Sequence, residues 1–223
     1  MPVFNEEELL PAVLQRVRAV ELDKEIILVD DGSTDGSRAI IEREAQRPDT
    51  KAVCYTPNRG KGAAIRAGLA HAAGDIVVIQ DADMEYDPSQ LPALVAPIME
   101  GKARAVFGSR FQGAIYDMRL ANRVANYILA RFVSLAYGHR LTDEATAYKA
   151  FDRRLLQSLD LQCKRFEFCP EATAKTIRSG ERILEIPITY HARTWEEGKK
   201  IKFRDFLVAL WTLTRCRFWR PRK

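Results

Sequence analysis

Four acidic residues at alternate positions follow an apolar run near the middle of the chain: Asp81, Asp83, Glu85 and Asp87. Residues 76–79 are consecutive aliphatic residues, a pattern typical of a strand buried on both faces of a parallel sheet. In open α/β sheets, ligands bind beyond the carboxyl ends of the strands, so these acids are expected at a ligand site. Their mutual repulsion favours a cation, and carboxylate oxygens suit Mg²⁺ or Mn²⁺. A solvated acidic turn before a helix explains the same residues equally well.

A second apolar run also ends in acid. Residues 25–29 read as another buried strand, and Asp30 and Asp31 follow it. Farther along, Gly60, Lys61 and Gly62 lead into an alanine-rich helical stretch. Such residues can offer backbone N–H groups and a cation to a phosphate, whereas a plain turn before a helix accounts for them too. The sequence therefore predicts two acidic strand ends and one candidate phosphate contact along one edge of a sheet.

Strand-like and helical stretches alternate, which predicts an α/β fold with a Rossmann-like, mainly parallel sheet flanked by helices. Asn5 is expected to cap the first helix, whose apolar stripe contains Leu10, Val13, Leu14 and Val17. Further strands are expected at residues 52–55, 105–110 and 183–188, and one more after a loop within 141–151. Further helices are expected at 37–46, 63–73, 89–99, 119–137, 152–159, 170–179 and 203–214, while 191–200 shows no clear structural signal.

The chain has 223 residues, 47% hydrophobic and 29% charged, which suits one globular α/β domain. No stretch approaches the roughly 18 uninterrupted apolar residues of a membrane span. The formal net charge is +5, and cations concentrate near the C-terminus, where the predicted helix 203–214 has a broad apolar face. A basic amphipathic helix favours a membrane surface, although a terminal helix docked on the core gives the same pattern. The four cysteines show no metal-site spacing and are expected to be reduced thiols.

Five stretches, in order, resemble motifs of the family 2 inverting glycosyltransferases, which have the GT-A fold. They are residues 2–7, 29–36, 58–62, 81–88 and 108–110. The nearest likeness is to the polyprenyl-phosphate, dolichyl-phosphate mannosyltransferase-like branch, through residues 141–143, Thr146, Tyr148, Lys149, 185–188 and 193–201. The resemblance covers essentially the whole chain. The chain departs from the family in lacking the hydrophobic residues that normally precede Pro2, and in having Ala147 where relatives often have glycine.

This resemblance implies roles for individual residues. Asp81 and Asp83 match the DxD motif, with Asp83 and Glu85 reaching a Mg²⁺ or Mn²⁺ ion and Asp81 reaching the ion or the donor ribose. The nucleotide is expected to contact Glu6, Asp30, Asp31 and Lys61. Phosphate groups of the donor or the acceptor are expected to contact Arg110, Arg119, Arg123 and Arg193, because guanidinium groups bind phosphate in bidentate geometry.

The acceptor decides whether a general base is needed. A lipid phosphate is already an anion at neutral pH, so its attack on the sugar requires no strong base. A hydroxyl acceptor requires a carboxylate to remove its proton, and Asp143 or Glu144 would be the candidate. The expected catalytic residues are Asp81, Asp83, Asp143, Arg110 and Arg193.

The function implied by the resemblance is transfer of a sugar from a UDP- or GDP-sugar to a polyprenyl phosphate at the cytosolic face of a membrane. Residues 1–200 are expected to form the GT-A domain, with an incomplete first strand, and residues 201–223 a basic membrane-surface tail. The expected location is cytoplasmic and peripheral on that membrane. A membrane protein is expected as a further partner, and nucleic acid is not.

Three alternatives remain open at this point. One is a glycosyltransferase of cell-envelope polysaccharide synthesis that uses a hydroxyl acceptor. Another is a nucleotidyltransferase, which usually has a glycine-rich phosphate loop after the first strand, where this chain has Asn5 and three glutamates. The third is a nucleic-acid-binding module that uses the basic C-terminal cluster, but the acidic sheet end would repel a nucleic-acid backbone.

Overall fold

The first part of the chain forms a three-stranded parallel sheet. In the computed structural model, which describes residues 1–193 and 203–221, this sheet has the order β1-β2-β3. Its strands are β1 (Pro2–Val3), β2 (Ile26–Asp31) and β3 (Thr50–Tyr55), and its helices are α1 (Leu10–Ala19), α2 (Ser37–Glu44) and α3 (Lys61–Leu69). Helices cover both faces of this sheet, which explains the continuous aliphatic sequence of β2.

The second part forms a four-stranded mixed sheet in the order β4-β6-β5-β7. Its strands are β4 (Ile76–Val78), β5 (Ala105–Tyr116), β6 (Lys149–Asp152) and β7 (Ile183–His191). The strands β5 and β7 are parallel, whereas β6 runs antiparallel to β4 and β5. The helical elements are η1, a short 3₁₀ helix (Pro88–Gln90), α4 (Leu91–Met99), α5 (Leu120–Tyr137), α6 (Arg153–Ser158), α7 (Phe168–Arg178) and α8 (Phe203–Cys216).

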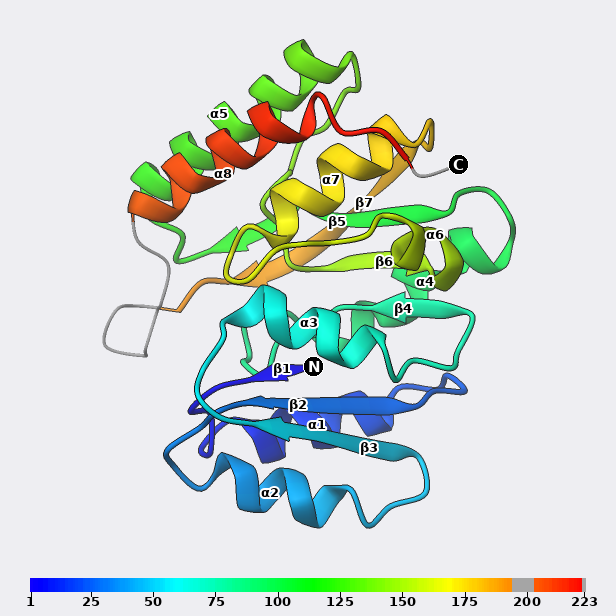
Figure 1. Cartoon of the computed structure of the whole chain (residues 1–223), viewed down its shortest axis with the longest axis vertical. Coiled ribbons are helices and arrows are strands. Elements are labelled where there is room, and N and C mark those ends of the chain that lie inside the picture. Colours follow the sequence, from blue (N-terminus) through cyan, green and yellow to red (C-terminus); the bar gives the residue numbers. More distant parts are fainter. Residues whose placement is uncertain (194–202, 222–223) are drawn as a thin grey trace.

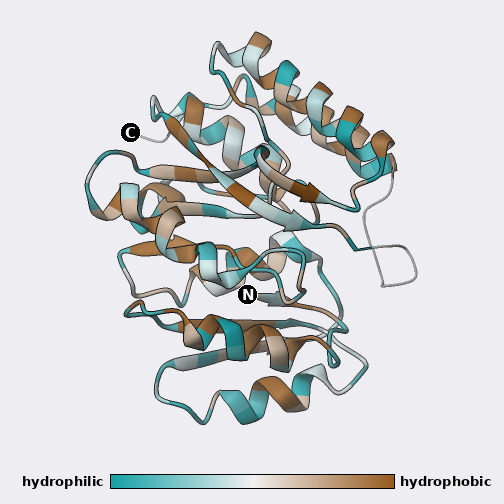
Figure 2. Ribbon diagram, turned by 180° about the vertical axis from the view of Figure 1, so that it is seen from behind, coloured by the Kyte–Doolittle hydropathy of each residue, from teal (hydrophilic) through white to brown (hydrophobic). Residues whose placement is uncertain are grey.

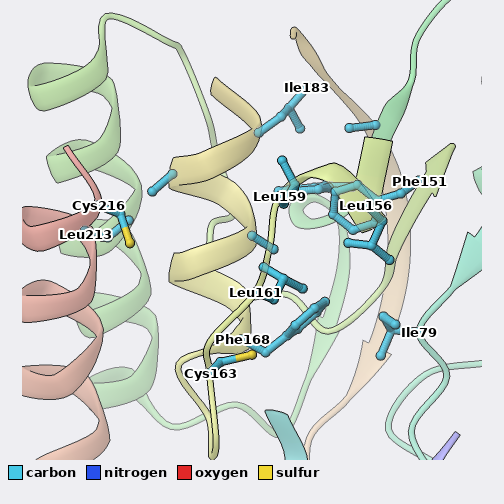
Figure 3. Close-up of a cluster of buried hydrophobic side chains, with 14 of the residues drawn as sticks. Ile79, Phe151, Leu156, Leu159, Leu161, Cys163, Phe168, Ile183, Leu213 and Cys216 are labelled. Atoms are coloured by element: carbon cyan, nitrogen blue, oxygen red, sulfur yellow. The ribbon is translucent and has the colours of Figure 1, made fainter. Parts of the chain in front are cut away.

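The two sheets meet with β1 and β4 as their facing edges, as Figure 1 shows. Parallel pairing in β1–β2, β2–β3 and β5–β7, with helices over the sheets, confirms the predicted fold class. A large buried apolar cluster lies beneath α7, and it includes Phe151 of β6 and Phe168 of α7 (Figure 3). This packing fixes the second sheet against its helical layer.

The C-terminal helix α8 has one face on this core. Leu213 and Cys216 of α8 are buried in the same cluster, and α8 contacts both α7 and α5 (Figures 1 and 3). Its opposite face exposes large apolar side chains, namely Phe203, Leu207, Val208 and Trp211. Figure 2, seen from the opposite side, shows hydrophobic and hydrophilic residues alternating along the helices of this layer. None of the helices in residues 1–193 and 203–221 is long and apolar enough to span a membrane.

Two local expectations are wrong. Asn5 does not cap the first helix, because α1 begins at Leu10 after Leu9 at the cap position. Asn5 instead has a φ of 53°, and its side-chain oxygen accepts a hydrogen bond of 2.8 Å from the backbone N–H of Thr34. The strand β4 is only half-buried rather than buried on both faces, because a cavity lies beside it. The stretch 194–202, which includes most of the predicted motif 193–201, lies outside the described residues.

Candidate functional site

A cleft of about 410 Å³ lies beyond the carboxyl ends of β1, β2 and β4, where the sequence predicts a ligand site. The N-terminus of α3 and the residue range 165–166 complete its wall. It contains seven of the predicted site residues: Glu6, Asp31, Lys61, Asp81, Asp83, Glu85 and Arg193. The cleft therefore brings together residues that are almost 190 positions apart in the sequence.

Lys61 neutralises Asp81, the first acid of the loop that follows β4; we call residues 81–87 the acidic loop. Its ammonium group lies 2.6 Å from Oδ1 and 2.7 Å from Oδ2 of Asp81. Burial alone would lower the pKa of Lys61, but the neighbouring acidic groups, Asp81 foremost, together outweigh burial, and the pKa is raised. Lys61 therefore stays charged at the first position of α3, pointing into the cleft.

Arg193, which follows β7, bridges two acids from distant segments. Its Nη2 lies 2.8 Å from Oδ2 of Asp83, and its Nη1 lies 3.2 Å from Oε2 of Glu6. Burial and the neighbouring charges of Asp81 and Glu85 together raise the pKa of Asp83 to about 7, against the opposing effect of Arg193. The acidic loop thus carries more negative charge than its own surroundings neutralise.

Glu85 fixes the position of Arg193. Its Oε1 accepts a hydrogen bond of 2.8 Å from the backbone N–H of Arg193, and its Oε2 accepts one of 2.9 Å from the Tyr190 hydroxyl. A backbone hydrogen bond from His191 to the Glu85 carbonyl adds a further link. Glu85 therefore ties the end of β7 to the acidic loop.

Asp30 and Asp31 hold the loops around the cleft. Asp31 accepts hydrogen bonds from the Asn58 side chain and from the backbone N–H groups of Arg59 and Gly60, at 2.9, 2.7 and 2.8 Å. Asp30 is fully buried, does not line the cleft, and pairs with Arg38 at 2.7 Å. Asn58 belongs to this network and also lines the cleft, although the sequence does not single it out as a site residue.

The N-terminus of α3 is already occupied by protein groups. The backbone N–H groups of Gly62 and Ala63 donate to the carbonyls of Arg165 and Lys164, both at 2.9 Å. Of the two explanations that the sequence left open for this turn, the plain turn before a helix holds at Gly62, because a carbonyl oxygen takes the place of a phosphate. This contact also brings Arg165 and Phe166 into the cleft wall. The sequence does not predict either residue, because no local motif marks them. They are positioned by contact between two segments about 100 residues apart in the sequence.

The remaining predicted residues lie outside the cleft lining. Arg110 and Asp143 form a buried bidentate pair, with Arg110 Nε and Nη2 each 2.7 Å from an Asp143 oxygen. The Arg110 guanidinium lies 5.0 Å from the centre of the Tyr190 ring, so the pair touches the residue that holds Glu85. Arg119 and Arg123 are exposed at the beginning of α5.

The predicted three-carboxylate metal site is not assembled. Within the part of the chain that the structure describes, no three His, Cys, Asp or Glu side chains converge to hold an ion. The physical reason is that Lys61 and Arg193 hold Asp81 and Asp83, while both oxygens of Glu85 accept other hydrogen bonds. Asp81 and Asp83 nevertheless fit a hard divalent cation, since both carboxylates line the cleft and carboxylate oxygens are the ligands that such ions prefer.

Comparison of the sequence with known proteins finds a matching family model and similar proteins. The model of glycosyl transferase family 2 matches residues 1–159. The undecaprenyl-phosphate 4-deoxy-4-formamido-L-arabinose transferases of Proteus mirabilis and Enterobacter sp. are both 31% identical over 97% of this chain. The chain spans 66% and 65% of the length of these two relatives.

Solved structures show the same fold. Glucosyl-3-phosphoglycerate synthase from Mycobacterium tuberculosis, in complex with UDP, superposes with a TM-score of 0.71 at 23% identity, over 100% of this chain and 79% of that one. The same protein with Mn²⁺ and UDP-glucose gives a TM-score of 0.71 at 22% identity, over 100% of this chain and 78% of that one.

Proposed function

The chain belongs to glycosyl transferase family 2, and from this premise we propose that it transfers a sugar from a nucleotide-diphosphate sugar to a polyprenyl phosphate. The curated relatives are named for undecaprenyl phosphate, which supports an acceptor of this class. The donor occupies the cleft beyond β1, β2 and β4. The uridine nucleotides in the solved relatives of the same fold support a donor of this kind.

One observation carries the choice of acceptor. Each acidic residue in the described lining of the cleft has a cation or a hydrogen-bond donor on its carboxylate: Glu6, Asp31, Asp81, Asp83 and Glu85. The two alternative bases, Asp143 and Glu144, are fully buried and lie outside the lining. An acceptor that needs no deprotonation fits this cleft, and a phosphate monoester anion meets that condition.

The reaction is one in-line displacement. An oxygen of the acceptor phosphate forms a bond to the anomeric carbon while the bond from that carbon to the donor diphosphate breaks, and the nucleoside diphosphate leaves. Lys61 and Arg193 are two cleft cations that can bind the diphosphate. Asp81 and Asp83 would hold Mg²⁺ or Mn²⁺, which when bound neutralises the charge that develops on the leaving group. Arg110 and Asp143 act as positioning residues through Tyr190 and Glu85.

The acceptor is tested with a matched pair of lipids. The protein is incubated with a nucleotide sugar, Mn²⁺ and either undecaprenyl phosphate or undecaprenol, which has the same chain but a hydroxyl in place of the phosphate. The expected result is a sugar–phosphate lipid from the first and no product from the second. Transfer to undecaprenol, with none to the phosphate, would contradict the proposal and favour a base-assisted reaction at a hydroxyl.

The exposed face of α8, defined as Phe203, Leu207, Val208 and Trp211, supports a peripheral location at a cytosolic membrane surface. Cations flank it at Arg204, Arg215 and Arg220, all exposed, and the adjacent α5 exposes Leu120, Val124, Tyr127, Ile128 and Leu135. Apolar side chains can enter the lipid interface while arginines meet anionic headgroups.

Vesicle flotation tests this location. Replacing Leu207→Ser and Trp211→Ser together should reduce binding to vesicles that contain anionic lipid, with little change in the unfolding temperature. Met99→Ser is the matched control, because Met99 is exposed and apolar but lies at the end of α4. Unchanged flotation of the double variant, or binding to RNA or DNA without binding to lipid, would reject the membrane surface as the partner.

A further inference from the structure

The loop before α7 adds a cation to the cleft wall. Arg165 lines the cleft together with Lys61 and Arg193, and its side chain is exposed. Lys61 and Arg193 each pair with a carboxylate of the cleft. Among residues 1–193 and 203–221, the Arg165 guanidinium forms no ion pair and no hydrogen bond. Its charge is therefore available to a ligand, whereas the other two charges are already bound by acids.

The backbone and the aliphatic stem of Arg165 are held in place. Its N–H donates a hydrogen bond of 3.0 Å to Glu167, and its carbonyl accepts one of 2.9 Å from Gly62. Its Cγ lies against Gly60, since a Cβ atom added to that glycine would be 2.9 Å from it. Figure 1 shows this loop beside the start of α3. Because the stem is ordered before a ligand arrives, less entropy is lost when the guanidinium binds.

An anionic acceptor enters a cleft that is rich in acid. Five acidic and three basic residues form its described lining. A divalent cation on Asp81 and Asp83 would offset this excess, but the donor diphosphate brings negative charge back. A second phosphate is then repelled unless a further cation faces it. Lys61 and Arg193 lie on the two acids proposed for the metal, beside the donor diphosphate, while Arg165 belongs to a separate loop.

The other arginines that the sequence suggests for phosphate lie elsewhere. Arg110 is buried and holds Asp143 through two side-chain hydrogen bonds, so its guanidinium is already occupied. Arg119 and Arg123 are exposed at the beginning of α5 and lie outside the cleft lining. Arg165 is thus the exposed arginine that combines a place in the described lining with an unpaired charge.

We propose that Arg165 binds the phosphate of the lipid acceptor, an inference that rests on the proposed function. A phosphate monoester has three unesterified oxygens. The guanidinium holds two of them in bidentate geometry, and the third attacks the anomeric carbon as the nucleoside diphosphate leaves. The product is a phosphodiester, which carries less negative charge and is released more readily. The next residue, Phe166, is half-buried in the same lining and offers an apolar contact to the first isoprenoid unit.

The test measures the binding of each substrate separately, so it does not depend on turnover. Farnesyl phosphate, a short polyprenyl phosphate, is titrated below its micelle concentration, and UDP and GDP are titrated with Mn²⁺. Arg165→Gln should weaken farnesyl phosphate binding by about tenfold or more and change nucleotide binding by less than about twofold. Arg165→Lys should recover part of the affinity, because lysine keeps the charge without the bidentate geometry. Lys164→Gln is the matched control, since Lys164 is an exposed cation in the same loop but outside the lining.

The contrary outcomes are distinct. The inference is overturned if the native chain does not bind farnesyl phosphate, if Arg165→Gln leaves that binding unchanged, or if it weakens nucleotide binding equally. Equal weakening together with a lower unfolding temperature and no recovery in Arg165→Lys would show a structural role instead. Inorganic phosphate should bind about tenfold more weakly than farnesyl phosphate, and equal binding would make the ligand a free phosphate. Failure of the proposed function looks different: farnesyl phosphate binds through Arg165, but no sugar is transferred to it.

Discussion

At the scale of single residues, two side-chain cations occupy the places where ligand charges are expected. Lys61 pairs with Asp81, and Arg193 pairs with Asp83 and Glu6. The Nε of Arg193 is buried and has no hydrogen-bond partner within the described residues, so this guanidinium is not fully satisfied by the protein. We infer an exchange of partners on ligand binding, in which Asp83 turns to a divalent cation and Arg193 to the donor diphosphate.

Replacing Arg193→Gln should therefore change metal binding and turnover in opposite directions. Mn²⁺ should bind about three- to tenfold more tightly, because the ion no longer competes with a guanidinium for Asp83. Sugar transfer should fall by about a hundredfold, because the diphosphate loses a cationic contact. Titration of free Mn²⁺ by electron paramagnetic resonance and a transfer assay measure the two effects. Arg47→Gln is the control, since the Arg47 side chain is exposed, pairs with Glu44 and lies outside the cleft lining. A parallel loss of both properties in Arg193→Gln would count against partner exchange.

Glu144 should make stability depend on pH. It is fully buried, its Oε2 has no hydrogen-bond partner within the described residues, and the nearby charges are Lys149, Asp143 and Arg110. Burial raises its pKa from an ordinary 4.5 to about 7. The folded state binds this proton more tightly than the unfolded state. The contribution of Glu144 to the free energy of unfolding is therefore complete below pH 4.5 and is lost as the pH rises through 7.

The measurement is urea unfolding of the native chain and of Glu144→Gln between about pH 4 and pH 8. The native chain should lose up to about 3 kcal/mol more unfolding free energy than the variant over this range. Other titrating groups are common to both proteins, so the difference isolates Glu144. Parallel curves for the two proteins would show that Glu144 ionises in the folded state as it does in water.

At the scale of elements, the loop at 164–166 and the N-terminus of α3 hold the cleft wall together. Gly60 has a φ of 96°, and a Cβ atom there would lie 2.5 Å from the carbonyl oxygen of Lys164. The same approach lets Gly62 and Ala63 bond to this loop and sets Lys61 in line with Asp81. The glycines flanking Lys61 thus serve close backbone packing rather than direct phosphate binding.

Gly60→Ala should destabilise the fold by about 3 kcal/mol, from backbone strain together with steric overlap. Gly101→Ala is the matched control, because Gly101 has a φ of 69° but open space around its Cβ position. This second change should cost only about 1 to 2 kcal/mol, from strain alone. Chemical denaturation measures both. Equal losses would mean that contact with the 164–166 loop adds nothing to the stability of the α3 N-terminus.

The structure confirms one of the two interpretations that the sequence left open for the helix α8. Its buried face, with Ala209, Thr212, Leu213 and Cys216, packs on the core, so part of the apolar pattern reflects docking. Its other face exposes Phe203, Leu207 and Trp211, and contact of this face with a membrane surface stays a prediction. Periodicity alone cannot separate two apolar faces on one short helix, because neighbouring stripes merge when both are wide.

At the scale of the whole molecule, the sequence predicts the alternation of strands and helices well, because each long element has its own periodicity. The acidic ends of β2 and β4 also predict the location of the cleft, since parallel strands share one carboxyl edge. The roles within the cleft are harder to predict. Asp31 has the right type and place, but its oxygens hold the 58–60 loop.

Long-range contacts explain most of what the sequence does not reveal. Arg165 enters the cleft only because its loop packs on Gly60 and Gly62, and no local pattern encodes that contact. Likewise, the pairing of Arg110 with Asp143 joins positions 33 residues apart and removes both from the cleft lining. A side chain's type shows what it can bind, whereas its partner in the fold determines what it does bind.

The most direct test of the central claim is a binding screen of UDP-, GDP- and dTDP-sugars, with and without Mn²⁺, on the native chain and on Asp83→Asn. Asp87→Asn is the control from the same acidic loop, because Asp87 lies outside the cleft lining and caps η1. The account predicts that at least one nucleotide sugar binds only with Mn²⁺, that Asp83→Asn weakens this binding by about tenfold or more, and that Asp87→Asn does not. Absence of metal-dependent binding to every nucleotide sugar would contradict it.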